Sequence, residues 1–320
     1  MTEPLPFVSV IVPTHRRRDL LRRLLASLIA QEWPRDRYEI IVVHNVTDDG
    51  TAEMVAGIAA TSPVPIAYHP THFSGPGPSR QFGAERAQGA ILAFIDDDCT
   101  ATPGWIAAGV RAIRSGLALV QGRTLPRPDQ PRRLLEKTVT VIGPTPYFET
   151  CNIFYDAAVF HAVGGFPADF RDRFYGEDTA LGWAVTLAGH PTGFAEDALV
   201  HHEVFPLSFR RWLMEPTTMR HWPALVRAYP ALRKDLFLGI FLSRLTAAFD
   251  VCALGMLLAL LIHPSFLLLT LPYVALRFLD RGRLRNPVHL VARLLFGLPR
   301  AAILAGVLLR SSIAARSLVL

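Results

Sequence analysis

Three consecutive aspartates, Asp96, Asp97 and Asp98, follow the apolar run 91–95 in the stretch ILAFIDDDCT. Like charges this close repel one another, and none can follow the run into an apolar interior without compensation. Clustered carboxylates of this kind either bind a hard divalent cation or remain solvated loop charges. Mg²⁺ and Mn²⁺ prefer oxygen ligands and often take only one or two from the protein, which leaves positions for phosphate oxygens and water. The sequence therefore offers a cation site suited to a nucleotide diphosphate.

Two adjacent histidines, His201 and His202, follow a second strand-like run and add nitrogen ligands to the candidate chemistry. Either ring could complete a metal shell or contact a diphosphate, although a histidine in such a position can equally be structural. The three cysteines lie far apart and form no CxxC pair. That spacing argues against a zinc site or a disulfide framework and fits a reducing compartment.

Alternating strands and helices must position these residues. Segments 7–12 and 38–45 are apolar enough for buried strands, a short strand is expected at 64–68, and helical spacing covers 18–31 and 48–60. This alternation predicts a parallel α/β sheet, and in such sheets ligands bind outside the carboxyl ends of the strands. The residues at these ends that we expect to share one cleft are Thr14, His44, Asn45 and Asp96–Asp98.

The C-terminal part of the chain is both apolar and basic. Residues 1–206 carry 18 Lys/Arg and 23 Asp/Glu, whereas residues 207–320 carry 15 and 4. This combination favours an anionic membrane surface as the partner. Because no platform of interleaved aromatic and basic residues is evident, we expect no nucleic acid partner.

An uncharged stretch of 26 residues lies between Asp250 and Arg277, and His263–Pro264 divides it. Since roughly 20 apolar residues span a bilayer, we predict a transmembrane hairpin with helices at about 240–262 and 265–280. Basic residues at both ends of the hairpin favour a cytoplasmic location for those ends. The alternative is that these segments are core helices of a larger soluble fold.

A further helix is predicted at about 287–309, where His289, Arg293 and Arg300 fall on one side of a helical wheel. That pattern favours a helix lying in the membrane interface, with Pro299 kinking it. The N-terminal residues lack the basic start of a signal peptide, so we expect the catalytic part to face the cytoplasm at the plasma membrane.

Six stretches resemble family 2 glycosyltransferases in their order and approximate spacing: VSVIVPTHRR, EIIVVHNVTDDGT, GPSRQFGAERAQGAILAFIDDD, PGWI, AVGGF and GEDTAL. The resemblance implies a GT-A type fold, a Rossmann-like mixed sheet flanked by helices, and inverting transfer of a sugar from a nucleoside-diphosphate sugar to an acceptor hydroxyl. The expected organisation is a GT-A domain at 1–206, with a nucleotide-binding half at 1–100 and an acceptor half at 101–206, then an amphipathic basic linker at 207–235 and a hydrophobic, membrane-associated region at 236–320.

The resemblance also implies roles for the acidic residues. Asp96 would face the ribose and Asp98 would ligate Mg²⁺ or Mn²⁺, with Asp97 taking either role or capping the next turn. Asp96 and His202 are further candidate metal ligands. Asp178 would accept the proton of the attacking hydroxyl, with Glu177 in support, because a carboxylate within hydrogen-bond reach can act as a general base. The alternative for Asp178 is that it caps a helix.

Further positions match the family pattern with two departures. His44–Asn45 stands where relatives carry an acidic pair, and Trp183 stands near a common arginine. A surface salt bridge is the alternative role for Arg80, and the segment 209–212, FRRW, either closes over the donor or anchors the chain in the interface. By the resemblance, the nucleotide side comprises Pro13, Thr14, Arg16, His44, Asn45 and Arg80, and the acceptor side comprises Gly164, Gly165, Phe166 and Trp183.

Two other functions stay open on the sequence. A nucleotidyltransferase on a similar scaffold could use the basic run 16–18, and a non-catalytic membrane scaffold could retain the nucleotide cleft. For the glycosyltransferase, the apolar tail favours a glycan or lipid-linked acceptor in cell-envelope synthesis.

Overall fold

The computed structural model divides into two compact units. The first unit comprises Met1–Pro131 and Thr138–Phe205, and the second comprises Arg132–Lys137 and Pro206–Leu320. The structure describes residues 4–46, 48–73, 75–171, 176–279 and 287–320.

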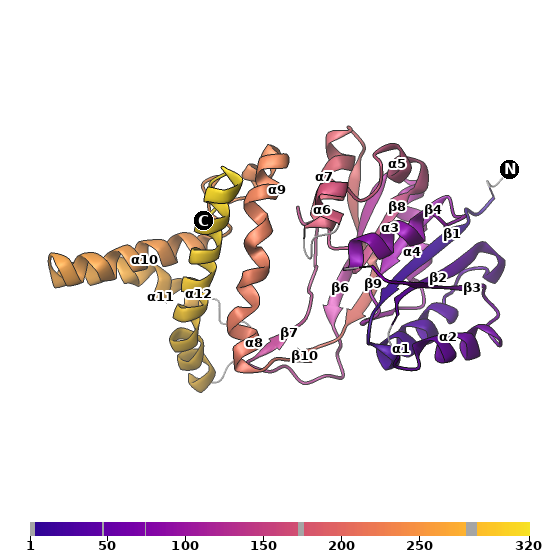
Figure 1. The fold of residues 1–320 in the computed structure, drawn as a ribbon, viewed down its shortest axis with the longest axis horizontal. Helices are drawn as coiled ribbons and strands as arrows, with labels where there is room; N and C mark the ends of the chain where they lie inside the picture. The colour runs from indigo at the N-terminus through magenta and orange to yellow at the C-terminus, as the bar shows by residue number, and fades with distance from the viewer. Residues whose placement is uncertain (1–3, 47, 74, 172–175, 280–286) are drawn as a thin grey trace. The chain divides into compact units, whose positions relative to one another are not determined.

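An eight-stranded mixed sheet forms the centre of the first unit (Figure 1), in the order β3-β2-β1-β4-β8-β6-β9-β5. Strands β3, β2, β1 and β4 run parallel. β8 is antiparallel to both β4 and β6, and β5 is antiparallel to β9. The strands are β1 Val8–Thr14, β2 Tyr38–Asn45, β3 Ile66–Thr71, β4 Ile91–Ile95, β5 Cys99–Ala101, β6 Leu119–Pro126, β8 Asn152–Asp156 and β9 Thr192–His202.

Helices cover both faces of this sheet, so its parallel strands read as continuous apolar runs. Alternate residues of β4 illustrate the arrangement: Ala93 belongs to the core cluster that contains Leu24 and Trp105, whereas Phe94 belongs to the cluster that contains Phe160 and Leu181. The helices of this unit are α1 Arg18–Ile29, α2 Thr51–Ala59, α3 Pro76–Ala84, α4 Trp105–Arg114, α5 Ala157–Ala162, α6 Ala168–Arg171 and α7 Glu177–Leu187, with the 3₁₀ helix η1 at Arg35–Arg37.

The predicted alternation and the mixed character of the second half of the sheet are confirmed, with shifted boundaries. The helix predicted at 18–31 ends at Ile29, and the strand predicted at 64–68 occupies Ile66–Thr71. Two positive-φ glycines, Gly50 and Gly176, stand immediately before α2 and α7. They let the backbone enter these helices from a left-handed conformation that other residues adopt at a cost.

The second unit is mostly helical. α10 begins at Arg244, where Ser243 and Thr246 form a capping box. The predicted second arm of the hairpin starts as a 3₁₀ helix, η4, before it becomes α11. The elements are α8 Phe209–Met214, η2 Glu215–His221, α9 Trp222–Ala228, η3 Pro230–Lys234, α10 Arg244–Leu261, η4 Pro264–Thr270, α11 Leu271–Leu279 and α12 Pro287–Ala315, with short strands β7 Glu136–Lys137 and β10 Phe205–Pro206 where the chain passes between units.

Among the described residues of the second unit, two helices are long and apolar enough to cross a membrane, Arg244–Leu261 and Leu295–Ala315. The helix predicted at 287–309 continues to Ala315 and contains Pro299. The basic cluster 281–285 and the side chains of His289 and Arg293 lie outside the described residues. The domain boundaries expected from the sequence, and the membrane crossings, stay predictions.

Candidate active site

The three aspartates lie at the carboxyl end of β4, beside the end of β1. The Thr14 hydroxyl donates a hydrogen bond of 2.7 Å to Asp97 Oδ2. Asp97 and Asp98 are buried, whereas Asp96 is partly exposed. Because β1 and β4 are neighbours in the sheet, the structure brings together Thr14 and the aspartates as the sequence predicted.

Arg17 compensates the two buried carboxylates. Its guanidinium lies 2.8 Å from Asp97 Oδ1 and 2.7 Å from Asp98 Oδ2, and 5.3 Å from the centre of the Phe205 ring. Burial raises the pKa of Asp97 to about 7, although the charge of Arg17 opposes that rise. Burial also raises the pKa of Asp98. A single cation therefore serves two adjacent acids, which leaves the cluster short of positive charge.

The sequence analysis did not single out Arg17 and selected Arg16 instead. Arg16 is exposed and has a φ of 55°, so it occupies the turn between β1 and α1. The signal that could have found Arg17 is its place in a three-arginine run directly after a strand that ends beside the aspartates.

Arg80 connects the aspartates to a second acidic group. Its guanidinium lies 2.5 Å from Asp96 Oδ1 and 3.0 Å from Glu177 Oε1. Because Arg80 is only 4% exposed, the alternative of a surface salt bridge is wrong. The three residues come from α3, the end of β4 and the start of α7, so one buried guanidinium joins three elements.

Asp178 follows Glu177 in the first turn of α7. Its Oδ1 accepts a hydrogen bond of 2.8 Å from the Thr179 amide, which satisfies one of the free amides of that turn. The residue at the N-cap position is Gly176. Burial, followed by the charge of Glu177, raises the pKa of Asp178 to about 8. A partly exposed carboxyl with a near-neutral pKa suits proton transfer.

Tyr155 is a further neighbour of Asp178 that the sequence analysis missed. Its hydroxyl is buried without a hydrogen-bond partner among the described residues. Burial and then the charge of Asp178 raise the pKa of Tyr155 well above its usual value. The phenol therefore stays neutral and keeps its proton.

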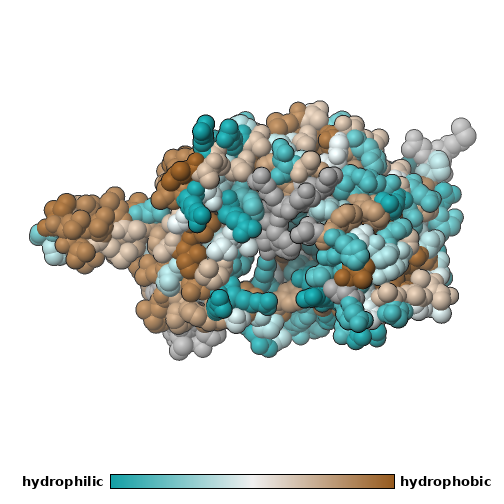
Figure 2. Space-filling model, in the orientation of Figure 1, coloured by the Kyte–Doolittle hydropathy of each residue, from teal (hydrophilic) through white to brown (hydrophobic). Residues whose placement is uncertain are grey.

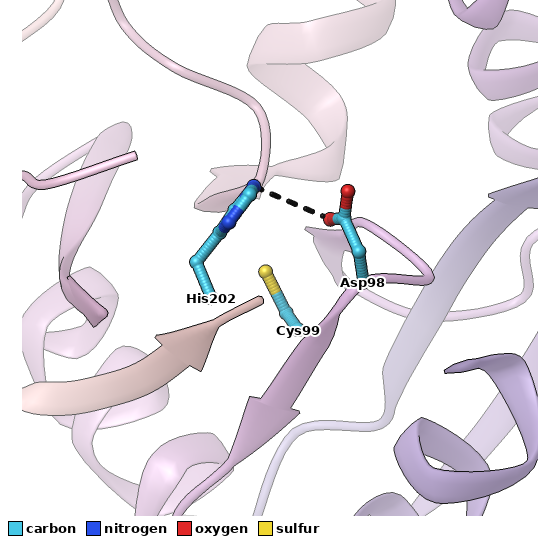
Figure 3. Close-up of side chains that lie close together, drawn as sticks. All are labelled: Asp98, Cys99 and His202. Carbon is cyan, nitrogen blue, oxygen red and sulfur yellow. Dashed lines mark ion pairs between the residues drawn. The ribbon is translucent and has the colours of Figure 1, made fainter. Parts of the chain in front are cut away.

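His202 faces Asp98 across the junction of β5 and β9 (Figure 3). Cys99 pairs with His202 in the register of these strands, which fixes the ring beside the aspartates. His202 Nδ1 lies 2.7 Å from the Glu203 carbonyl oxygen, and Nε2 lies 3.4 Å from Asp98 Oδ1. Because a carbonyl oxygen only accepts, Nδ1 carries the proton, and in the neutral ring Nε2 presents a lone pair to Asp98.

The pair of Asp98 and His202 fits a divalent cation. Asp98 Oδ1 is buried and has no hydrogen-bond partner among the described residues, so two lone pairs face each other unless a proton or a metal lies between them. The Cys99 thiol is a poorer ligand, since it lies 3.7 Å from the Cys151 carbonyl oxygen and its pKa is held well above the usual value by Cys151 and by burial.

The end of β2 presents one accessible side chain. His44 is only 1% exposed, and its Nδ1 lies 2.7 Å from the Tyr68 hydroxyl. Burial lowers the pKa of His44, so the ring is neutral. Asn45 is partly exposed and Pro13 is buried in β1. Of the two residues that replace the acidic pair of the family pattern, His44 and Asn45, only Asn45 is therefore accessible to a ligand.

The loop between α5 and α6 is joined to α3. The Phe166 amide donates a hydrogen bond of 2.9 Å to Gln81 Oε1. Gly165 has a φ of 67°, and a Cβ there would lie 2.3 Å from the same oxygen, so only glycine fits. Gly164 is exposed beside it. Trp183 of α7 is partly buried, and its indole N–H donates to the Pro146 carbonyl oxygen at 3.0 Å, so the indole nitrogen is already committed. The segment 209–212 belongs to the second unit.

Comparison with known proteins adds sequence relatives. The family described as "Glycosyl transferase family 2" matches residues 9–172. Glycosyltransferase AglE of Haloferax volcanii is 30% identical over 215 residues, which cover 64% of this chain and 70% of that protein. The poly(ribitol-phosphate) beta-N-acetylglucosaminyltransferase TarS of Staphylococcus aureus is 31% identical over 90 residues, but the match covers only 16% of that protein.

Two solved structures share the architecture. A mannosyltransferase, PcManGT from Pyrobaculum calidifontis in complex with GDP-Man and Mn²⁺, matches with a TM-score of 0.60 at 18% identity over 98% of this chain and 88% of that one. S. aureus TarS 1–349 in complex with UDP matches with a TM-score of 0.52 at 16% identity, over 97% of this chain and 92% of that one. Likeness at these identities confirms the predicted GT-A fold.

Proposed function

The chain belongs to glycosyl transferase family 2, and on that premise we propose that it is an inverting enzyme that transfers a sugar from a nucleoside-diphosphate sugar to an acceptor hydroxyl. The observation that supports the proposal is the buried Arg80 guanidinium, which joins Asp96 at the end of β4 to Glu177, the residue next to Asp178. Candidate donor-binding and proton-accepting groups thus share one site.

The donor would bind at the carboxyl ends of β1, β2 and β4. Asn45 and Thr14 offer polar contacts there, and the partly exposed Arg17 guanidinium could donate to a diphosphate once a metal cation shares the charge of Asp98. Asp98 and His202 would hold Mg²⁺ or Mn²⁺, with Asp96 a further candidate ligand from the sequence analysis. When bound, such a cation neutralises charge on the departing diphosphate. The Mn²⁺ in the PcManGT complex supports this choice of cofactor.

Asp178 would act on the acceptor. Its carboxylate takes the proton from the acceptor hydroxyl as the oxygen attacks the anomeric carbon in line, and the bond between that carbon and the diphosphate breaks. The proton ends on Asp178, the nucleoside diphosphate leaves, and the anomeric configuration inverts. Glu177 is buried and bonded to Arg80, so it positions its neighbour and does not contact the acceptor.

We place the reaction in glycan synthesis at a membrane. The TarS relative is named for transfer to poly(ribitol-phosphate), and two helices of the second unit meet the length and composition of a membrane span. The acceptor would be a glycan or a lipid-linked glycan of the cell envelope, met on the cytoplasmic face of the plasma membrane. Nucleic acid has no part in the proposal.

A turnover assay tests this function. The purified full-length protein is incubated with Mn²⁺ and a panel of nucleotide sugars, and the released nucleotide is identified by chromatography. Nucleoside diphosphate release supports glycosyl transfer, and proton NMR of the product reports inversion. Release of pyrophosphate would instead indicate a nucleotidyltransferase. Donor binding without turnover by any nucleotide sugar, with or without acceptor glycans, would indicate a scaffold.

A further inference from the structure

The hairpin of α10, η4 and α11 separates into a packed base and an exposed arm. At the base, Ala248, Phe249 and Cys252 of α10 are buried against Tyr273 of α11 and against α12. Beyond Cys252 the side chains of α10 become exposed and stay apolar, and Leu260 is 82% exposed. The exposed apolar residues of the arm are Leu254, Met256, Leu257, Leu260, Leu261, Ile262, Leu267, Leu268 and Leu271.

Charged residues mark the boundary between the base and the arm. Asp250 and Arg277 line one cavity, together with Glu215 and Arg300. Between Asp250 and Arg277 the sequence carries no formal charge. Figure 2 shows this arm as an almost continuous hydrophobic surface. The charged residues of the hairpin therefore lie at its base. The side chains beyond them are apolar and favour an apolar environment such as lipid.

Several backbone amides at the tip of the arm find partners within the turn itself. The amides of Ile262 and His263 donate to the Leu258 carbonyl oxygen, and the Phe266 amide donates to the His263 carbonyl oxygen. The Ser265 amide donates to His263 Nδ1, and the hydroxyl of Ser265 lies 2.8 Å from the same nitrogen. Amides that are paired within the turn are compatible with hydrocarbon, where water offers them no partner.

The whole of α10 has the length of a membrane span, but the uncharged arm beyond Asp250 is too short to cross. Residues 251–262 form roughly 12 helical residues, which extend about 18 Å at a rise of 1.5 Å per residue. A bilayer has a hydrocarbon core about 30 Å thick. The tip carries no charged or aromatic-polar anchor for a far interface. Close packing of the two limbs, in which a Cβ on Gly255 would lie 2.6 Å from Leu269 Cβ, keeps the arm narrow.

From these observations we infer that the hairpin is a re-entrant membrane anchor, which enters one leaflet, turns at His263–Pro264 inside the hydrocarbon and returns to the same side. The occupant of the exposed apolar surface is thus a single lipid leaflet. The sequence alone predicted two crossings of the whole bilayer. The inference rests on the membrane association proposed above. It replaces the predicted transmembrane hairpin with a hairpin that enters and leaves the membrane on the same side.

A depth measurement tests the inference on the full chain. Cysteine is introduced singly at Leu254, Leu257, Leu261 and Ser265, and each variant is labelled with an environment-sensitive fluorophore and bound to vesicles of phosphatidylethanolamine and phosphatidylglycerol. Lipids that carry a quencher either near the headgroup or near the chain end report depth. Lys234→Cys, on the exposed surface of η3, is the solvated control, and the unlabelled parent with its buried cysteines is the blank.

A re-entrant hairpin predicts that deep quenching relative to shallow quenching rises at each step from Leu254 to Ser265. Ser265→Cys should then resist a membrane-impermeant maleimide from both faces of the membrane. A ratio that peaks near Leu257 and falls again at Ser265, with labelling from the far face, would show two crossings and overturn the inference. Absence of quenching at every position would also overturn the inference. That result is expected, for example, if this surface binds a second copy of the chain instead of lipid.

The activity assay separates this inference from the proposed reaction. The four labelled positions belong to the second unit, whereas every residue assigned to the chemistry belongs to the first. Donor hydrolysis with Mn²⁺ is therefore measured on each variant in detergent. Turnover combined with quenching that does not deepen towards Ser265 would reject only the re-entrant anchor. Quenching that deepens towards Ser265 without turnover would reject only the proposed glycosyltransferase activity.

Discussion

In the first unit, buried carboxylates lie beside guanidiniums, whereas in the second unit the hairpin beyond Asp250 and Arg277 exposes apolar side chains and carries no charge. Both arrangements are costly in water alone. Buried charge is tolerated only when it is paired, and exposed hydrocarbon is tolerated only when something apolar covers it. Under the functions proposed above, a divalent cation and a diphosphate would bind the first region, and lipid would cover the second.

The sharpest way to test the charged region is to remove its one candidate base. Asp178→Asn keeps the size and the hydrogen bond to the Thr179 amide but cannot accept a proton. We expect kcat for transfer to fall by about 10²–10⁴, the usual contribution of a positioned base. Donor affinity, measured by calorimetry with Mn²⁺, should change little. Near-normal turnover would leave Asp178 as a helix-capping residue.

Breaking the buried charge pairing should destabilise the fold. Arg80→Ala leaves Asp96 and Glu177 without their cation, and removal of one partner of a buried pair typically costs about 3–5 kcal/mol. The free energy of unfolding in urea reports this loss. Arg111→Ala is the matched control, because its pair with Asp197 is exposed and should contribute less than about 1 kcal/mol. Equal losses in both variants would contradict a structural role for the Arg80 pairs.

Adding a charge to the uncharged arm of the second unit should weaken its binding to lipid. Leu261→Asp places a carboxylate near the tip, where insertion into hydrocarbon costs about 2.5–3.5 kcal/mol. We expect vesicle binding to weaken roughly 100-fold in a flotation assay, while donor hydrolysis in detergent is retained. Asp235→Asn, an exposed change on the same unit, should leave flotation unaltered. Unchanged binding of Leu261→Asp would remove the arm from contact with lipid.

The pH dependence sharpens the role of Asp178 with a smaller effect. Its carboxyl has a pKa raised to about 8, and a base works only when it is deprotonated. We therefore expect kcat/KM, which reports the free enzyme, to rise about tenfold per pH unit below pH 8 and to level off above it. The folding linkage has the opposite sign, because a raised carboxyl pKa means that stability is lost as pH rises through it. A flat rate profile across this range would assign the proton transfer to another group.

Strand periodicity was enough to predict the sheet and the position of the aspartates. Parallel strands end at one edge, so Thr14 and Asp96–Asp98 could be brought together from the sequence alone. The roles of neighbouring positions could not be separated in this way. Whether Arg16 or Arg17 reaches the aspartates depends on one backbone turn, at Arg16 φ 55°. Whether His201 or His202 faces Asp98 depends on the register between β5 and β9.

Distance along the chain limited the other predictions. Arg80 and Glu177 are 97 residues apart, and their contact depends on how α3 and α7 cover the same face of the sheet. His44 appeared available for binding because it ends a strand, but Tyr68 of the adjacent strand covers it. Such facts arise from packing between elements, which the pattern within any one element does not encode.

The three-way bond at Arg80 also constrains protein engineering. Exchanging the second half of the sheet for that of another glycosyltransferase would import a new residue at position 177, while position 80 stayed native. A chimera without an acidic residue at position 177 would leave the buried Arg80 guanidinium with one carboxylate fewer. Such a chimera should fold poorly, whatever its substrate preference. Recombination libraries on this scaffold should therefore treat positions 80, 96 and 177 as one inherited block.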